Sequence, residues 1–133
     1  MRIAYVTTDE VNLILAVKLA GRWGATVSLV RPGDRASTAR CDAVLHDLDV
    51  VPRDQRTAFL EELRHGTQDR PTAVHGYGIA DEQSEALRRH GVAVAQRLHP
   101  GLLRSLCQAA QPSRATPPPD DDLTDLTWIN LAD

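Results

Sequence analysis

The sequence predicts an α/β fold in which a doubly wound, mostly parallel sheet of five strands carries helices on both faces. Two observations support this prediction. Short apolar segments alternate with longer segments of helical periodicity along the first 110 residues. Three predicted helices end in basic residues or histidine followed by glycine, and a strand follows each glycine closely, which is typical of repeated βα units.

The individual elements follow from these patterns in order. Five apolar segments predict strands, at residues 3–6, 25–30, 41–48, 71–75 and 92–95. Four segments predict helices, at residues 9–23, 53–65, 81–90 and 101–110. Only residues 33–40 separate the second and third strands, so the second helix is expected to be short or missing.

The positions of apolar residues predict which helix faces are buried. In the first helix these residues are Val11, Ile14, Leu15, Leu19 and Trp23. In the helix predicted at residues 53–65 they are Phe59, Leu60 and Leu63, and in the one at 101–110 they are Leu102, Leu103, Leu106 and Cys107. The glycines after three helices, Gly24, Gly66 and Gly91, are expected to take the left-handed conformation that caps a helix.

Composition limits the classes of function. The net charge of -3 and the pI near 5.9 give no overall attraction to nucleic acid or to an anionic membrane. Cys41 and Cys107 lie far apart without the spacing of a metal site, so buried reduced thiols are expected. No segment approaches the ~20 apolar residues of a membrane span. We therefore expect a cytoplasmic protein.

The chain is predicted to contain one domain, residues 1–110, followed by a linker and a tail. Residues 111–122 are rich in proline and aspartate, which is typical of a linker. Residues 123–133 are apolar enough to pack on the domain itself or to bind a partner protein through Trp128.

The most informative residue is Asp47, because it ends the predicted third strand. In open parallel sheets the working groups lie just outside the carboxyl ends of the strands, so Asp47 is the best candidate for a chemically exposed carboxylate. Three histidines, His46, His75 and His99, also fall at or near strand ends. They and Asp47 are candidate ligands of a transition metal, but strand alternation should point His46 and Asp47 to opposite faces.

The order of the elements, Asp47 and the Val11-Asn12 pair together resemble the receiver domain of bacterial two-component response regulators across residues 1–110. The resemblance implies a flavodoxin-like sheet and a phosphorelay role. It implies that Asp47 accepts a phosphoryl group from a histidine kinase, with Mg²⁺ held by neighbouring carboxylates.

Several positions depart from the receiver pattern. The acidic pair expected after the first strand falls on Thr7 and Thr8, with Asp9 and Glu10 displaced toward the helix, where they also suit an ordinary helix N-terminus. Gly76, or Tyr77 in a shifted register, matches the expected hydroxyl residue. Gln96 or Arg97 matches the expected lysine, and Lys18 on the first helix is the only lysine in the chain.

These departures predict a pseudo-receiver, a signalling module that binds proteins and is not an enzyme. A histidine kinase or a signalling scaffold is the expected partner, and a homodimer is a further option. Docking is expected through the fourth and fifth elements, with Tyr77 as a contact residue. Leu102, Leu103 and Leu106 are either contact residues or core. No cofactor is expected, and Mg²⁺ would be needed only for phosphorylation.

Two alternatives stay open. In the first, Asp47 is phosphorylated and Asp9, with Asp49 or Glu10, holds magnesium in a rearranged site. In the second, the chain is a flavodoxin-like enzyme that binds a small molecule through Thr7, Thr8 and the N-terminus of the first helix.

Overall fold

Five parallel strands form one sheet in the order β2-β1-β3-β4-β5. The computed structural model describes residues 1–66 and 69–110. The strands are β1 (Arg2–Val6), β2 (Thr26–Val30), β3 (Ala43–Asp47), β4 (Thr72–His75) and β5 (Val92–Ala95). This strand order is that of flavodoxin-like folds, with the switch point between β1 and β3. The predicted linker 111–122 and tail 123–133, with Trp128, lie outside the described residues.

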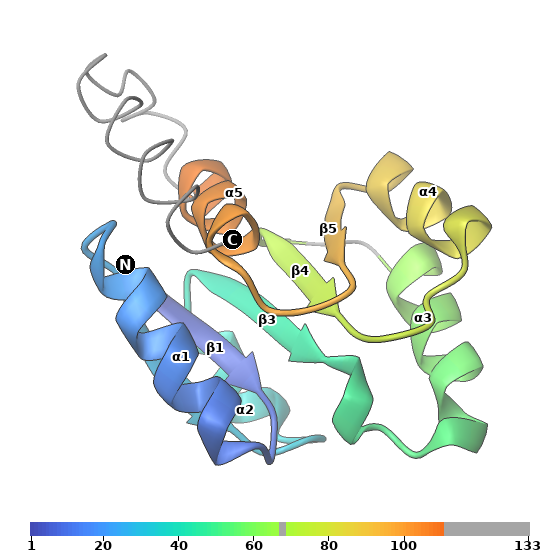
Figure 1. Cartoon of the computed structure of the whole chain (residues 1–133), viewed down its shortest axis with the longest axis horizontal. Coiled ribbons are helices and arrows are strands. Elements are labelled where there is room, and N and C mark those ends of the chain that lie inside the picture. The colour runs from blue at the N-terminus through green and yellow to red at the C-terminus, as the bar shows by residue number, and fades with distance from the viewer. Residues whose placement is uncertain (67–68, 111–133) are drawn as a thin grey trace.

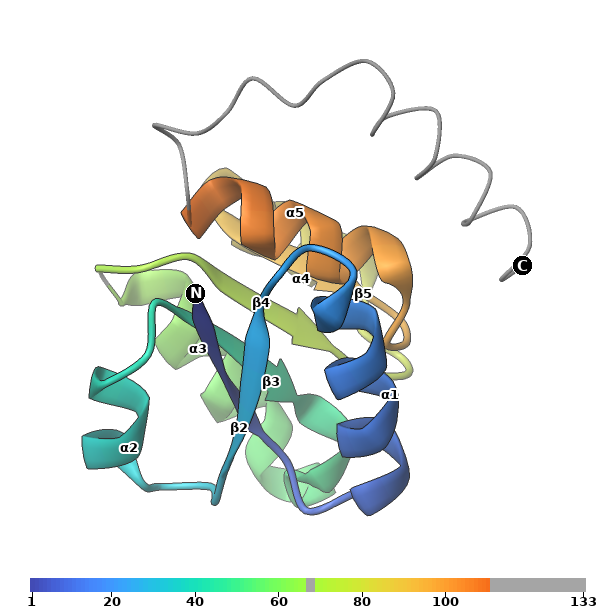
Figure 2. The same ribbon diagram turned by 90° about the vertical axis from the view of Figure 1, so that its left-hand side faces the viewer.

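Helices cover both faces of the sheet, as a doubly wound fold requires (Figures 1 and 2). One face carries α1 (Glu10–Gly21) and α5 (Pro100–Ala110), and the other carries α2 (Arg35–Ala39), α3 (Arg56–His65) and α4 (Asp81–Arg89). Two short 3₁₀ turns, η1 (Leu48–Val50) and η2 (Arg53–Gln55), join β3 to α3. The prediction of the fold class is confirmed, including the short second helix.

Strand alternation divides the core between the two faces. Tyr5 and Leu45 lie with the α1 and α5 residues in the larger apolar cluster. Val74 and Leu48 lie in the second cluster, with residues of α3 and α4. The predicted apolar side of α5 is buried: Leu102, Leu103, Leu106 and Cys107 all belong to the larger cluster. The three leucines are therefore core residues.

The buried face of α1 differs from the predicted one. Val11 and Ile14 are 74% and 58% exposed, whereas Ala16, Leu19 and Ala20 are buried. Apolar residues occur almost all around this helix, so periodicity alone does not select a face. The alanines face the sheet because their small side chains let the helix approach it closely.

The glycines after the helices also differ from one another. Gly24 and Gly91 have positive φ angles of 71° and 83°, as expected for left-handed caps. Gly66 has an extended backbone instead, with φ -74° and ψ 148°. Its N–H still donates to the Glu62 carbonyl, so α3 closes with an ordinary helical hydrogen bond and needs no left-handed residue.

The two cysteines are found as the sequence predicts. Cys41 and Cys107 are both free thiols and both buried. No helix in the described ranges is long and apolar enough to cross a membrane.

Candidate functional site at the carboxyl ends of β3 and β4

Asp47 and His75 are the last residues of two neighbouring strands, β3 and β4, and they are register partners. Both are almost completely buried, with 2% and 1% of their surface exposed. Two ionisable side chains are thus held side by side on the face that carries α1 and α5. They lie at the carboxyl ends of the strands, where open parallel sheets bind their ligands.

The Asp47 carboxylate is held by hydrogen bonds on both oxygens. Thr7 Oγ1 donates to Asp47 Oδ2 at 2.7 Å, and the Asn12 amide lies 3.5 Å from the same oxygen. The other oxygen, Oδ1, accepts from the backbone N–H of Asp49 at 3.0 Å. The carboxylate therefore caps the η1 turn and ties it to the end of β1.

His75 is held from the opposite side by Tyr5. The Tyr5 hydroxyl and His75 Nε2 lie 2.5 Å apart, in a buried contact. Burial raises the pKa of Tyr5 far above its usual range, so the phenol stays protonated. Burial also lowers the pKa of His75, although the Asp47 charge opposes this effect, so the imidazole is neutral near pH 7. Its Nδ1 faces Asp47 Oδ1 at 4.0 Å.

Asp49 adds a second, exposed carboxylate to this pair. Its Oδ1 accepts from the backbone N–H of Tyr77 at 3.1 Å, which links the turn after β3 to the loop after β4. One ligand atom each from Asp47, Asp49 and His75 lies within 4.8 Å of the others. Asp49, one of the three metal ligands predicted from the sequence, therefore lies beside Asp47.

Asp9 and Glu10 lie differently. Asp9 is the N-cap of α1, and its Oδ1 accepts from the N–H groups of Val11 and Asn12 at 2.9 and 3.1 Å. Glu10 is exposed in the first turn of that helix. Both positions match the helix N-terminus that the sequence allowed for them.

Gly76 follows His75 and is packed against Leu48. A Cβ atom added at Gly76 would lie 2.6 Å from Leu48 Cβ and 3.1 Å from its Cδ2. Because Leu48 is 2% exposed and belongs to the core, it has little room to move away. The space next to position 76 is thus filled by an apolar side chain.

The remaining sequence-predicted switch residues do not contact Asp47 in the described part of the chain. Gln96 bridges to the loop before α4, where its Oε1 accepts from Gly78 N and its Nε2 donates to Ile79 O. Arg97 is exposed and forms no ion pair with any described residue. Tyr77 is 70% exposed, so its ring is available to a partner.

Two of the three histidines near strand ends lie away from Asp47. The His46 ring packs edge-on against Phe59, at 5.2 Å between ring centroids, on the opposite face of the sheet. Burial lowers the pKa of His46 to about 4. His99 accepts from Gly101 N at the start of α5. Alternation therefore separates His46 from Asp47, as the sequence predicts.

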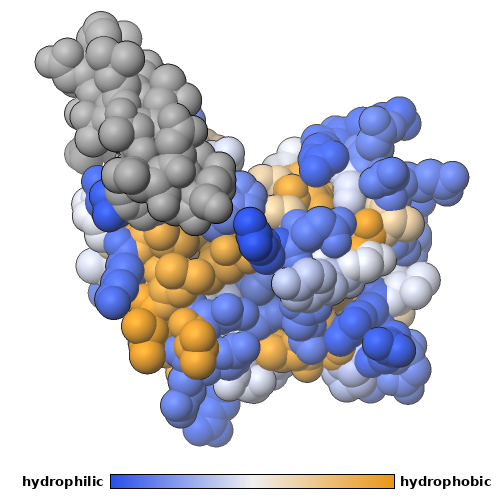
Figure 3. All heavy atoms as spheres, in the orientation of Figure 1, coloured by the Kyte–Doolittle hydropathy of each residue, from blue (hydrophilic) through white to orange (hydrophobic). Residues whose placement is uncertain are grey.

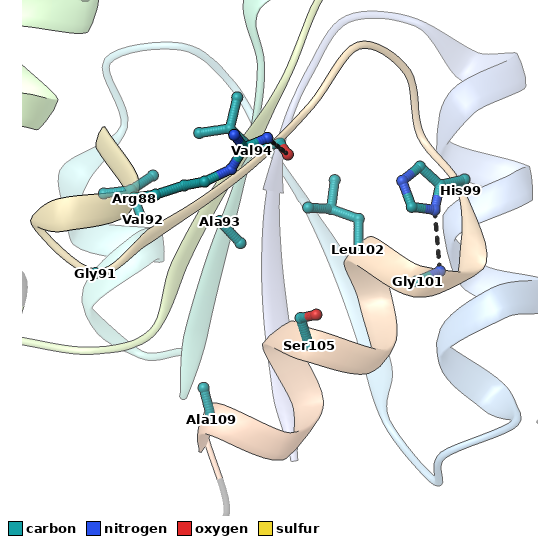
Figure 4. Close-up of a pocket in the computed structure, with 10 residues that line it drawn as sticks. All are labelled: Arg88, Gly91, Val92, Ala93, Val94, His99, Gly101, Leu102, Ser105 and Ala109. Atoms are coloured by element: carbon teal, nitrogen blue, oxygen red, sulfur yellow. Dashed lines mark hydrogen bonds between the residues drawn. The ribbon is translucent and has the colours of Figure 1, made fainter. Parts of the chain in front are cut away.

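A groove of about 460 Å³ lies between α4, β5 and α5 (Figure 4). Val92 and Leu102 contribute apolar lining, and Arg88 and Ser105 contribute polar groups. Arg88 also donates to the Val94 carbonyl at 3.3 Å, which holds the end of α4 against β5.

Tyr5 and Asn12 contribute to the site although neither was predicted as a site residue. A signal for Tyr5 was present, because Tyr5 lies in β1, the strand next to β3, two residues before Thr7, and side chains two residues apart in a strand share a face. Asn12 was considered only as part of the Val11-Asn12 pair. Its approach to Asp47 depends on the conformation of the residues that connect β1 to α1.

Comparisons with known proteins add little. No protein-family model matches the chain, and no curated protein matches it. Among solved structures it is similar to a short-chain flavodoxin associated with a non-canonical PDU bacterial microcompartment. The identity is 14%, the alignment covers 86% of this chain and 97% of that one, and the TM-score is 0.41. The assignment of the fold therefore rests on the strand order and connections described above.

Proposed function

We propose that the chain is a receiver-like signalling module that acts by protein–protein binding, with Asp47 serving as a structural group instead of a phosphoryl acceptor. The observation that carries this proposal is the state of the Asp47 carboxylate. It is buried, and both of its oxygens accept hydrogen bonds from the protein.

Phosphoryl transfer to a carboxylate needs an exposed nucleophilic oxygen and a cation that neutralises the approaching charges. Asp47 Oδ2 instead accepts a 2.7 Å hydrogen bond from Thr7. The end of β1, where a receiver-like site needs carboxylates, carries the hydroxyls of Thr7 and Thr8. The nearest carboxylate along the chain, that of Asp9, is engaged with α1 amides.

The positions that would couple phosphorylation to a switch support the same proposal. A hydroxyl side chain at position 76 would meet Leu48 at far less than contact distance. Gln96 is neutral and bonded to the loop before α4. No lysine is present at the end of β5. Gly76 therefore offers no hydroxyl group, and Gln96 no positive charge, that could respond to a phosphoryl group on Asp47.

Two surfaces support a role in protein binding. The first is the α4–β5–α5 groove, which has both apolar and polar lining. The second, here named the α1 apolar surface, consists of the exposed side chains of Val11, Ile14, Leu15 and Val17. Figure 3 shows hydrophobic side chains gathered over α1. Contiguous exposed apolar side chains of this kind are characteristic of interaction sites.

The N-terminus of α1 is poorly suited to a flavodoxin-like phosphate site. Two of the amides that would face an anion there already donate to the Asp9 carboxylate. The negative charges of Asp9 and Glu10 would also repel it. A small-molecule enzyme that uses Thr7, Thr8 and this helix end is therefore disfavoured.

Incubation with phosphoramidate and Mg²⁺ tests the proposal without requiring a kinase. The protein is analysed by intact mass spectrometry, with an active receiver protein in the same tube to show that the reagent works. We expect the mass of this chain to stay unchanged while the control gains one phosphoryl group. A phosphoryl group that appears on the wild-type chain and is absent from Asp47→Asn would overturn the proposal.

A further inference from the structure

Three potential metal ligands from two strand ends converge at one place. Asp47 and Asp49 come from the end of β3 and the turn after it, and His75 comes from the end of β4. Their ligand atoms lie within 4.8 Å of one another. Asp47 and His75 are buried, and exposed Asp49 forms the side that faces solvent.

The charge of this cluster is not balanced by neighbouring basic side chains. Among the described residues, neither Asp47 nor Asp49 forms a salt bridge with lysine or arginine. Arg56 approaches Asp49, but it donates to the backbone carbonyl and not to the carboxylate. Two carboxylates so close together repel each other unless a cation lies between them.

The buried His75 imidazole is held between Tyr5 and the Asp47 carboxylate. Its side chain is 1% exposed, Nε2 contacts the Tyr5 hydroxyl, and Nδ1 faces Asp47 Oδ1 at 4.0 Å. The Tyr5 oxygen can accept from Nε2–H, which places the imidazole lone pair on Nδ1, toward the two carboxylates. A histidine that binds a metal through one ring nitrogen usually donates a hydrogen bond from the other.

We propose that Asp47 Oδ1, an Asp49 carboxylate oxygen and His75 Nδ1 bind a divalent transition-metal ion of the Zn²⁺ class. The nitrogen ligand favours such an ion over Mg²⁺, which prefers oxygen ligands and retains its waters. Three protein ligands leave a fourth position open to water or to a ligand from a partner protein.

The geometry requires only small movements. Bonds of about 2.0–2.1 Å to a tetrahedral Zn²⁺ place the ligand atoms about 3.3 Å apart. The Asp47–His75 pair must therefore close from 4.0 Å by less than 1 Å. Asp49 is the exposed member and has the most freedom to rotate inward. Asp47 Oδ1 can keep its hydrogen bond from Asp49 N, because a carboxylate oxygen has two lone pairs.

This site does not depend on the proposed function, since it rests on the ligand geometry alone. The two proposals are compatible, because in both of them Asp47 is a bound group and not a nucleophile. Phosphoramidate labelling tests the first, and metal binding tests the second, so the failure of either can be distinguished.

Calorimetric titration of the untagged chain, residues 1–133, with Zn²⁺ tests the site. We expect one Zn²⁺ per chain, and excess Mg²⁺ should not displace it. Asp49→Asn keeps an oxygen for Tyr77 N but loses the charge. It should weaken binding by at least about tenfold, because that is the smallest loss typical even when only a hydrogen-bond partner of a ligand is removed. The matched control is Glu61→Gln, since Glu61 and His65 form an exposed pair on α3 that could also chelate zinc.

The control should bind Zn²⁺ as the wild type does. The proposal is overturned if wild-type protein binds no Zn²⁺, if Asp49→Asn keeps the wild-type affinity, or if Glu61→Gln abolishes binding. Long-range ¹H–¹⁵N spectra of the imidazoles give a second readout that needs no variant. We expect the His75 Nδ1 resonance to move on addition of Zn²⁺; movement of His65 or His90 in its place would also contradict the site.

Discussion

At the scale of single residues, the chemistry available to Asp47 is decided by its neighbours. An aspartate that ends a strand in a parallel sheet is normally exposed to ligand. Here Thr7, Asn12 and the Asp49 amide occupy its oxygens, and His75 lies beside it. The result is a buried polar network that joins the ends of β1, β3 and β4.

The hydrogen bond from Thr7 should contribute measurably to stability. Thr7→Val removes a buried donor to a carboxylate and should lower the free energy of unfolding by about 1–3 kcal/mol. Thr7→Ser keeps the hydroxyl and should lose less. Urea denaturation measures both.

Thr8→Val is the matched control, because Thr8 is the exposed neighbour. It should change the free energy of unfolding by no more than about 0.5 kcal/mol. Equal effects at positions 7 and 8 would show that Thr7 does not hold Asp47.

Cys107 should give the protein a pH dependence in the alkaline range. Burial in the α5 core raises the pKa of this thiol from 9.0 to about 11. The unfolded chain releases the thiol proton near pH 9, whereas the folded chain keeps it up to about pH 11. The stability from this group is therefore fully present below pH 9 and is lost as the pH rises to about 11.

The expected loss is about 1.4 kcal/mol per pH unit across that window, or roughly 2–3 kcal/mol in all. Urea denaturation at several pH values should show this slope in the wild type and a shallower one in Cys107→Ala. Parallel slopes in the two proteins would contradict the assignment.

At the scale of elements, the turn after β3 and the loop after β4 are fitted to each other. Leu48 in η1 packs against the backbone of Gly76, and Asp49 in the same turn accepts from Tyr77 N. Position 76 is therefore glycine for a steric reason: the space that a side chain needs is already filled.

Gly76→Ala should lower the free energy of unfolding by about 1–3 kcal/mol, because the new methyl group would overlap Leu48. Gly21→Ala is the control: it lies at the end of α1, where a Cβ atom has no neighbour within 4 Å, and it should be neutral or stabilising by up to about 1 kcal/mol.

A double-mutant cycle identifies the neighbour responsible. Leu48→Gly alone leaves a cavity, but it also removes the Leu48 Cβ atom that would lie 2.6 Å from the added methyl group. In combination with Gly76→Ala the new methyl group therefore has room, so the two costs should not add. Additive costs would mean that Gly76 is constrained by something other than Leu48.

The helices show where sequence patterns were sufficient and where they failed. The apolar side of α5 was predictable, since polar residues occupy its other side. For α1 the pattern was ambiguous, because Val11, Ile14 and Val17 are apolar and yet exposed. The face with the small Ala16 and Ala20 packs against the sheet. This preference comes from tertiary packing, and the sequence of the helix alone does not predict it.

At the scale of the whole molecule, the strand order brings the site together. Because β3 lies between β1 and β4, residues from three strand ends meet around Asp47. The sequence predicted the five strands and placed Asp47 and His75 at strand ends. It could not predict the contacts made by Tyr5, Thr7 and Asn12, which depend on strand register and on the path from β1 into α1.

The central claim is that Asp47 does not act as a phosphoryl acceptor, and amide NMR with beryllium fluoride tests it most directly. This ion mimics a phosphoryl group on a carboxylate. The reference sample contains Mg²⁺ and fluoride without beryllium, so that any effect of Mg²⁺ alone is removed, and Asp47→Asn is recorded in parallel. We predict that beryllium leaves the resonances of Asp47, Thr8 and Gly76 unchanged. Shifts at these residues in the wild type that are absent from Asp47→Asn would contradict the account and establish a phosphorylatable receiver.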